Sequence, residues 1–160
     1  MKRKLTSGIV GTMMLVMGVS SVTYAGEIKV QADTRGGTSG TSATVQSCVY
    51  TSVSIPITLT SDGNPVDWGS LYTSNTSNFQ ISVVAGQPLS ITGGAYRYGS
   101  GLYYAFAYPT GSNAKWYPGR TVLRIVASGL VNGVPQRGET LATITAEPLP
   151  GTTTTCGSGF

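Results

Sequence analysis

The 160-residue chain contains no histidine. This absence excludes catalysis by Ser-His-Asp or Cys-His groups and removes the commonest zinc ligand. Only six residues are acidic: Glu27, Asp33, Asp62, Asp67, Glu139 and Glu147. Asp62 and Asp67 form the one close pair, and they bracket a turn, which explains Asp62 more simply than a glycosidase role does. Because the sequence also lacks a phosphate-binding loop, a metal cluster and a nucleotide motif, we predict neither an enzyme nor a cofactor.

Basic residues are also few, and several of them lie at the extreme N-terminus. The whole chain has ten Lys and Arg residues against six Asp and Glu residues, a net charge of +4. Without Lys2, Arg3 and Lys4 the balance is seven to six, a net charge of +1. So small a charge gives no support for binding to nucleic acid or to an anionic membrane. We therefore expect no nucleic-acid partner.

The first 25 residues have the three parts of a secretory signal peptide. A basic start is followed by an apolar run from Ile9 to Val19, and then by Thr23-Tyr24-Ala25, with small residues suited to cleavage before Gly26. The alternative is a membrane anchor, but the run is shorter than the roughly 20 apolar residues that cross a bilayer. We predict that residues 1–25 are a signal peptide and that the protein is exported.

Cysteine is almost absent, and the two that occur, Cys48 and Cys156, enclose most of the chain. Exported proteins keep their disulfides, so we predict a bridge between them. Two free thiols, or pairing between chains, are the alternatives. In the chain-entropy description, a bridge that closes a loop of roughly 100 residues stabilises a protein by about 4–5 kcal/mol.

The rest of the sequence is typical of an extracellular β protein. Residues 53–60 alternate most clearly, with Val53, Ile55, Ile57 and Leu59 on one face. Further strands are predicted at 43–49, 79–83, 89–91, 120–131 and 140–147, with an aromatic hairpin over 96–108 that turns at 99–101. Residues 61–65 and Asn132-Gly133 are strong turn signals, the latter of type I′. No helix is predicted, and the pattern indicates one domain over residues 43–160, an immunoglobulin-like antiparallel β-sandwich.

Residues 26–42 precede this domain as a separate extension. Between Glu27 and Asp33 the residues Ile28, Val30 and Ala32 point to one side, which is the pattern of a strand with one buried face. Residues 35–42 are Gly, Ser and Thr after an initial arginine, the composition of a flexible linker. The alternative is an N-terminus that only frays. The alternation favours a strand on a tether.

The aromatic block near the middle of the chain is the one candidate ligand site. Exposed Tyr and Trp rings present flat apolar faces with polar tips, which suit stacking on sugars or on proteins. The candidate residues are Tyr96, Arg97, Tyr98, Lys115, Trp116 and Tyr117. In the alternative interpretation, about half of these rings fill the core of the sandwich and the others lie on strand surfaces.

An alternating strand, a Gly/Ser/Thr linker and a sandwich with two cysteines together resemble a subunit of the bacterial chaperone–usher fimbriae. The stretch Pro118-Gly119-Arg120-Thr121-Val122-Leu123-Arg124-Ile125-Val126 is similar to a strand near the C-terminus of such subunits. The resemblance implies a sandwich completed by a strand from a neighbouring subunit, with Ile28, Val30 and Ala32 as the donated residues. It also implies a periplasmic chaperone and an outer-membrane usher as partners, and a final location on the cell surface.

Two function classes remain open at this point. The first is a structural or adhesive fimbrial subunit whose partners are copies of itself or other subunits, and for an adhesive subunit a host glycan or protein as well. The second is a self-contained secreted β-sandwich module that binds a glycan or a protein, in which residues 26–42 are only a leader. An exported enzyme is a distant third.

Overall fold

A computed structural model describes residues 24–32, 42–86, 90–112, 114–148 and 156 of the chain. Residues 1–23 of the predicted signal peptide lie outside the described residues. So do residues 33–41, which include most of the predicted linker. Within the described part every regular element is a strand. That part holds no helix able to cross a membrane.

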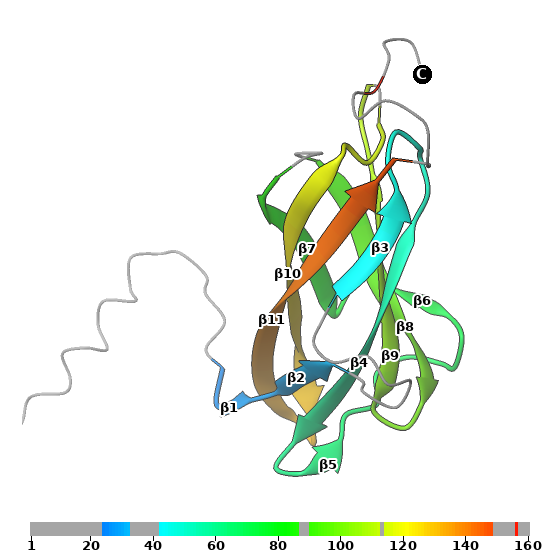
Figure 1. The fold of residues 1–160 in the computed structure, drawn as a ribbon. Coiled ribbons are helices and arrows are strands. Elements are labelled where there is room, and N and C mark those ends of the chain that lie inside the picture. The colour runs from blue at the N-terminus through cyan, green and yellow to red at the C-terminus, as the bar shows by residue number, and fades with distance from the viewer. Residues whose placement is uncertain (1–23, 33–41, 87–89, 113, 149–155, 157–160) are drawn as a thin grey trace, which may run out of the picture.

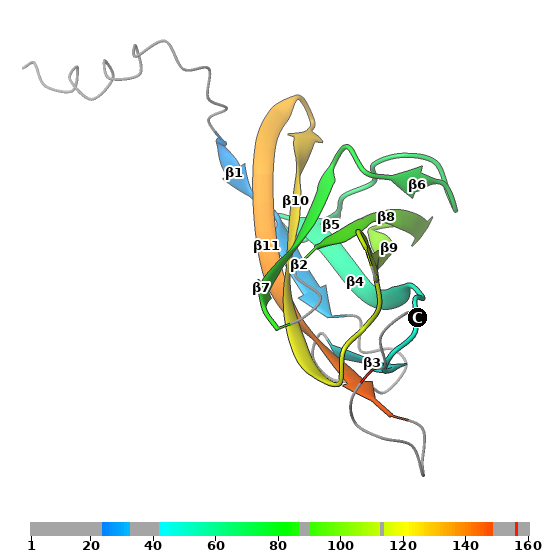
Figure 2. The same ribbon diagram turned by 90° about the horizontal axis from the view of Figure 1, so that it is seen from above.

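In the described part of the chain, eleven strands form two sheets that pack face to face (Figures 1 and 2). They are β1 (Gly26–Glu27), β2 (Lys29–Ala32), β3 (Ser42–Gln46), β4 (Val53–Ser61), β5 (Asn64–Pro65), β6 (Ser74–Asn75), β7 (Phe79–Ala85), β8 (Ile91–Gly99), β9 (Leu102–Pro109), β10 (Gly119–Val131) and β11 (Val134–Glu147). The first sheet has the order β1-β11-β10-β7, and β3 also pairs with β11. The second has the order β2-β4-β9-β8-β6, and β5 also pairs with β4. The predicted all-β sandwich is confirmed.

The core lies between the sheets and is built by alternation along the long strands. In β4 the side chains of Val53, Ile55, Ile57 and Leu59 are all buried, as predicted. They face Leu123, Ile125 and Ala127 of β10 and Ala142, Ile144 and Ala146 of β11, which belong to the same buried cluster. The period of two that the sequence shows therefore places one face of each strand inward.

Two tight turns have the backbone of type I′ hairpins, which need positive φ at both central residues. The sequence predicts this type for Asn132-Gly133 and a turn of unspecified type for residues 61–65. Asn132 and Gly133 have φ values of 52° and 80° and join β10 to β11. Asp62 and Gly63 have φ values of 51° and 80° and join β4 to β5. Asp62 and Asn132 of these turns line the same pocket, so both hairpins lie at the same end of the sandwich.

The strands are longer than predicted at two places, both of which contain glycine. β8 continues through Gly93 and Gly94. Gly93 is needed for the close approach of the neighbouring strand there, since a Cβ on it would lie 2.2 Å from the Phe106 carbonyl oxygen. β11 begins at Val134 rather than near 140, although it contains Pro135 and Gly138. These residues accommodate close approaches of neighbouring chain segments, which a sequence pattern does not reveal.

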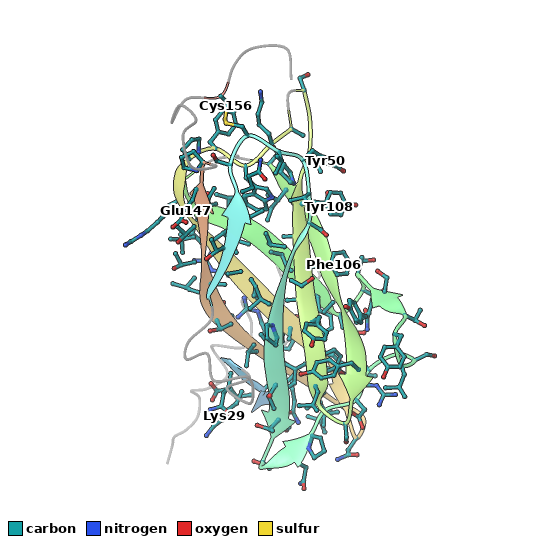
Figure 3. The ribbon with its side chains drawn as sticks, turned by 45° about the vertical axis from the view of Figure 1, so that its right-hand side comes forward. Lys29, Tyr50, Phe106, Tyr108, Glu147 and Cys156 are labelled. Atoms are coloured by element: carbon teal, nitrogen blue, oxygen red, sulfur yellow. A yellow bond between two sulfur atoms is a disulfide. The ribbon has the colours of Figure 1, made fainter. Side chains whose placement is uncertain are left out.

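The predicted disulfide is present between Cys48 and Cys156, whose Cα atoms are 5.2 Å apart. The bridge spans 108 positions of sequence. Cys156 lies at the top of the sandwich in Figure 3, whereas β5, which follows one of the two type I′ turns, lies at the bottom in Figure 1. The Cys48 amide donates to the Trp116 carbonyl oxygen at 2.6 Å. The bridge thus ties the C-terminal part of the chain to the loop between β3 and β4.

Candidate functional site: the groove that holds residues 26–32

The N-terminal segment, residues 26–32, lies between the edges of the two sheets and pairs with both of them (Figure 1). β1 runs parallel to β11, with Gly26 opposite Gln136 and Glu27 opposite Arg137. β2 runs antiparallel to β4, from Lys29 opposite Thr60 to Ala32 opposite Ile57. The segment therefore leaves one sheet and joins the other within a few residues.

Ile28 is the crossing point, and it is inserted into the core. Its side chain is 1% exposed and belongs to the buried cluster, and its amide donates to the Arg137 carbonyl oxygen at 3.0 Å. Val30 is half-buried and packs against the same cluster. The Ala32 side chain lies outside the described residues, although its backbone is paired. Burying an isoleucine side chain contributes about 1.5–3 kcal/mol, so Ile28 is the main apolar contact of the segment.

Gly138 of β11 makes room for this crossing. A Cβ at this position would lie 1.8 Å from the Ile28 carbonyl oxygen and 2.7 Å from its carbonyl carbon. No real side chain tolerates such distances to backbone atoms, so any other residue would displace the segment. Sequence reasoning missed this residue, and the available signal was a glycine next to a predicted strand, which often marks a close approach of backbone.

Gln136 and Ser61 close the groove beneath β1. The Ser61 hydroxyl of β4 donates to the Gln136 Oε1 of β11 at 2.5 Å, which joins the two sheet edges. A Cβ on Gly26 would lie 2.9 Å from the Gln136 side chain. The start of the segment therefore passes directly over a polar link between the sheets.

Removal of the segment would expose both edges of this groove. The β4 backbone over Ile57–Thr60 would lose the partner strand β2, and the β11 backbone near Gln136 would lose β1. Ile28 would also leave an apolar gap between the sheets. Unpaired strand edges with an apolar gap between them form a receptor for an added strand.

The six candidate ligand residues do not form one site, and the first three lie on β8. Tyr96 and Tyr98 project from the outer face of the second sheet, where the Tyr98 ring stacks on Tyr104 with centroids 4.4 Å apart. The centroid of the Tyr96 ring lies 5.5 Å from that of Tyr104 and 6.5 Å from that of Phe106. Arg97 instead donates to the Gly69 carbonyl oxygen from Nε at 3.2 Å and from a terminal nitrogen at 3.1 Å. Arg97 thus anchors a loop.

The array of rings continues along the same face toward the disulfide. Tyr108 lies 6.1 Å from Tyr50, edge to face, and Figure 3 shows Phe106, Tyr108 and Tyr50 along one side of the sandwich. Rings at these separations support one another across neighbouring strands. The array therefore accounts for most of the aromatic block as strand surface.

The prediction that Trp116 contacts a ligand is wrong. Its side chain is 0% exposed, and its Nε1 donates to the Thr51 carbonyl oxygen at 2.8 Å. A fully buried ring offers no face to a ligand, so Trp116 is a core residue. Lys115 is also buried, at 4% exposure, with its Nζ 6.0 Å from the centre of the Tyr117 ring. These residues lie near the disulfide, far along the sandwich from Tyr96 and Tyr98.

The two aspartates of the close carboxylate pair stabilise turns. Asp67 accepts from the Gly101 amide at 2.6 Å and from the Ser100 hydroxyl at 3.2 Å, which fixes the β8–β9 turn. Asp62 occupies the first central position of a type I′ turn. Among the residues that the structure describes, no group of three or more His, Cys, Asp or Glu side chains is placed to hold a metal ion.

Comparisons with protein-family models, with curated proteins and with solved structures found no match to this chain.

Proposed function

We propose that the protein is a structural or adhesive subunit of a bacterial surface fimbria, in which residues 26–32 of one copy occupy the groove of the next. The observation that carries this proposal is the burial of Ile28 between two strand edges, where Gly138 leaves room because it has no side chain. The same contacts form whether the segment belongs to the same chain or to another copy. Exchange of an identical element between copies therefore loses no contact.

The connection between the segment and the sandwich supports exchange. Residues 33–41 join β2 to β3, and most of them are Gly, Ser or Thr. Nine residues span at most about 30 Å when extended, since each residue contributes about 3.3–3.6 Å. Such a tether lets the segment leave its own groove and reach a neighbouring copy. Because donor and groove are different surfaces, the contact repeats head to tail and generates an open filament.

The strand order indicates which strand would be exchanged. The orders β4-β9-β8 and β7-β10-β11 correspond to strands B-E-D and C-F-G of an immunoglobulin-like sandwich. In this assignment the chain supplies its own last strand, β11, and residues 26–32 occupy the position of the first strand. We infer that the donated segment replaces the first strand of the neighbouring copy.

The proposal includes export and assembly partners. A chain that polymerises through an open groove needs the groove covered before assembly, and a periplasmic chaperone and an outer-membrane usher would do this. The assembled protein would lie on the cell surface. No catalytic activity forms part of the proposal.

We expect the chain beginning at Gly26 to form oligomers whose size increases with protein concentration. Each junction buries Ile28 and completes two strand ladders, so the oligomers should persist in mild denaturant. Sedimentation velocity over a concentration series measures their size, and electron microscopy of the producing cells shows whether filaments are present. A monomer at every concentration, with no surface filaments, would favour the self-contained binding module instead.

A further inference from the structure

A pocket of about 400 Å³ lies at the end of the sandwich that carries the two type I′ turns. Its walls come from the β4–β5 turn, the β10–β11 turn and the residues that follow β5. The residues that line it include Asp62, Asn64, Trp68, Leu130, Asn132 and Gln136. Pockets of about 300–1,000 Å³ with a few convergent polar groups are the usual form of small-molecule sites.

Trp68 is held in a fixed position on the pocket wall. Its Nε1 donates to the Leu130 carbonyl oxygen at 2.9 Å, and its ring packs edge to face against Phe79 with centroids 6.1 Å apart. A Cβ on Gly129 would lie 2.9 Å from the ring, so the indole lies against bare backbone there. An aromatic ring fixed in this way provides a rigid stacking surface.

Tyr103 fixes the backbone that leads to this ring. Its hydroxyl donates to the Val66 carbonyl oxygen at 2.8 Å and accepts from the Trp68 amide at 2.7 Å. Burial raises the pKa of Tyr103 to about 12, so the hydroxyl keeps its proton and its bond to the Val66 carbonyl oxygen even in moderately alkaline solution. The pocket wall is therefore already in place before a ligand binds.

The polar side chains of the pocket are those of Asn64, Asn132 and Gln136, the carboxylates of Asp62 and Asp67, and the Ser61 hydroxyl. The Gln136 Oε1 already accepts from Ser61, which leaves its amide nitrogen as the donor. The Asp67 carboxylate is held by Gly101 and Ser100, whereas Asp62 sits exposed on its turn. Asn132 is exposed on the opposite turn. The pocket thus offers a carboxylate that accepts hydrogen bonds, side-chain amides that donate and accept them, and an indole ring.

The charge of the pocket restricts its ligand. None of the residues that line it is Lys or Arg, and two are Asp. Phosphates, sulfates and acidic sugars would meet the negative charge of Asp62, because the Arg97 guanidinium, 3.7 Å from the Asp67 carboxylate, offsets only the charge of Asp67. Hydroxyl groups of an uncharged sugar can donate to a carboxylate and accept from amides, while the C–H face of the ring packs on an indole.

We propose that this pocket binds an uncharged sugar residue, with Trp68 under the ring and Asp62 accepting from its hydroxyl groups. The pocket lies within one copy of the sandwich, so this inference holds whether or not the chain polymerises. It gives the adhesive role of the proposed function a ligand pocket of its own, whereas the groove serves assembly.

The two tryptophans of the chain provide the measurement, because Trp68 lines the pocket and Trp116 is buried near the disulfide. Indole N–H signals of ¹⁵N-labelled protein, assigned with Trp68→Phe, are followed while the methyl glycosides of glucose, galactose, mannose and N-acetylglucosamine are added. We expect at least one glycoside to shift the Trp68 signal saturably, with a Kd on the order of 1 mM or tighter. The Trp116 signal should stay in place.

Asp62→Asn tests the role of the carboxylate without changing the turn, because asparagine also adopts positive φ before glycine. We expect the affinity for the glycoside to fall about tenfold or more, with the melting temperature unchanged. Glu139→Gln, which removes an exposed carboxylate outside the pocket, should leave the affinity as it was. Methylamine, which is a cation at neutral pH, is added separately as a probe for a positively charged ligand. The proposal is overturned if no glycoside shifts the Trp68 signal saturably, if only methylamine does so, or if Asp62→Asn binds the glycoside as tightly as the original chain.

Discussion

We expect the free energy of unfolding of a chain that begins at Ser42 to be about 2–5 kcal/mol lower than that of the chain that begins at Gly26. This is the range for emptying a large core position, and Ile28 fills such a position between the sheets. The truncated chain also loses the ladders from β1 to β11 and from β2 to β4. Urea unfolding followed by circular dichroism measures the difference.

A synthetic peptide of residues 26–34 should restore stability to the truncated chain by several degrees in melting temperature. The same peptide with Ile28→Asp should have no effect, because an unpaired carboxylate in the core is strongly unfavourable. Gln31→Asp is the matched control, since Gln31 is exposed and its replacement should leave the rescue intact. Equal stability of the long and truncated chains would show that the groove does not need the segment.

Loss of the disulfide has the second large effect. Replacing both Cys48 and Cys156 by alanine should lower the free energy of unfolding by about 4–5 kcal/mol, because the bridge closes a loop of 108 residues. Its removal also frees the loop between β3 and β4, whose Cys48 amide donates to the Trp116 carbonyl oxygen. Melting curves with and without a reducing agent measure the effect in the original chain.

The double alanine variant is the control for this prediction. Its melting temperature should be low and independent of the reducing agent, whereas that of the original chain should fall to nearly the same value on reduction. If the original chain melts at one temperature in both conditions, the bridge contributes nothing to stability.

The strands and turns were largely predictable because their signals are local. Alternation along residues 53–60 identifies a strand with one buried face, and β4 has that burial pattern throughout. Asn132-Gly133 predicts a type I′ turn because both positions need positive φ, and both have it. The disulfide followed from the predicted export of a chain with only two cysteines, and the structure confirms the pairing.

The groove was not predictable, because it depends on contacts between distant parts of the chain. Gly138 is one of 22 glycines, and only the position of Ile28 across from it shows why a side chain there is excluded. The fate of each aromatic ring was hidden for the same reason. Tyr98 and Trp116 each follow a basic residue in the sequence, yet one lies on a strand face and the other is enclosed by the chain around Thr51.

The central claim is that residues 26–32 act between copies, and two variants of the chain that begins at Gly26 separate this from docking within one copy. Ile28→Asp spoils the donor and leaves the groove intact, whereas Gly138→Val blocks the groove and leaves the donor intact. Each variant alone should be a folded monomer, with circular dichroism as the check on folding. As a control, Ile28→Asp is mixed with a chain that carries both substitutions, which should give no complex.

Native mass spectrometry of an equimolar mixture of the two single variants is the most direct measurement. The account predicts a heterodimer with one chain of each variant, because the intact donor of the Gly138→Val chain fills the intact groove of the Ile28→Asp chain. A mixture that stays monomeric while both chains are folded would contradict it.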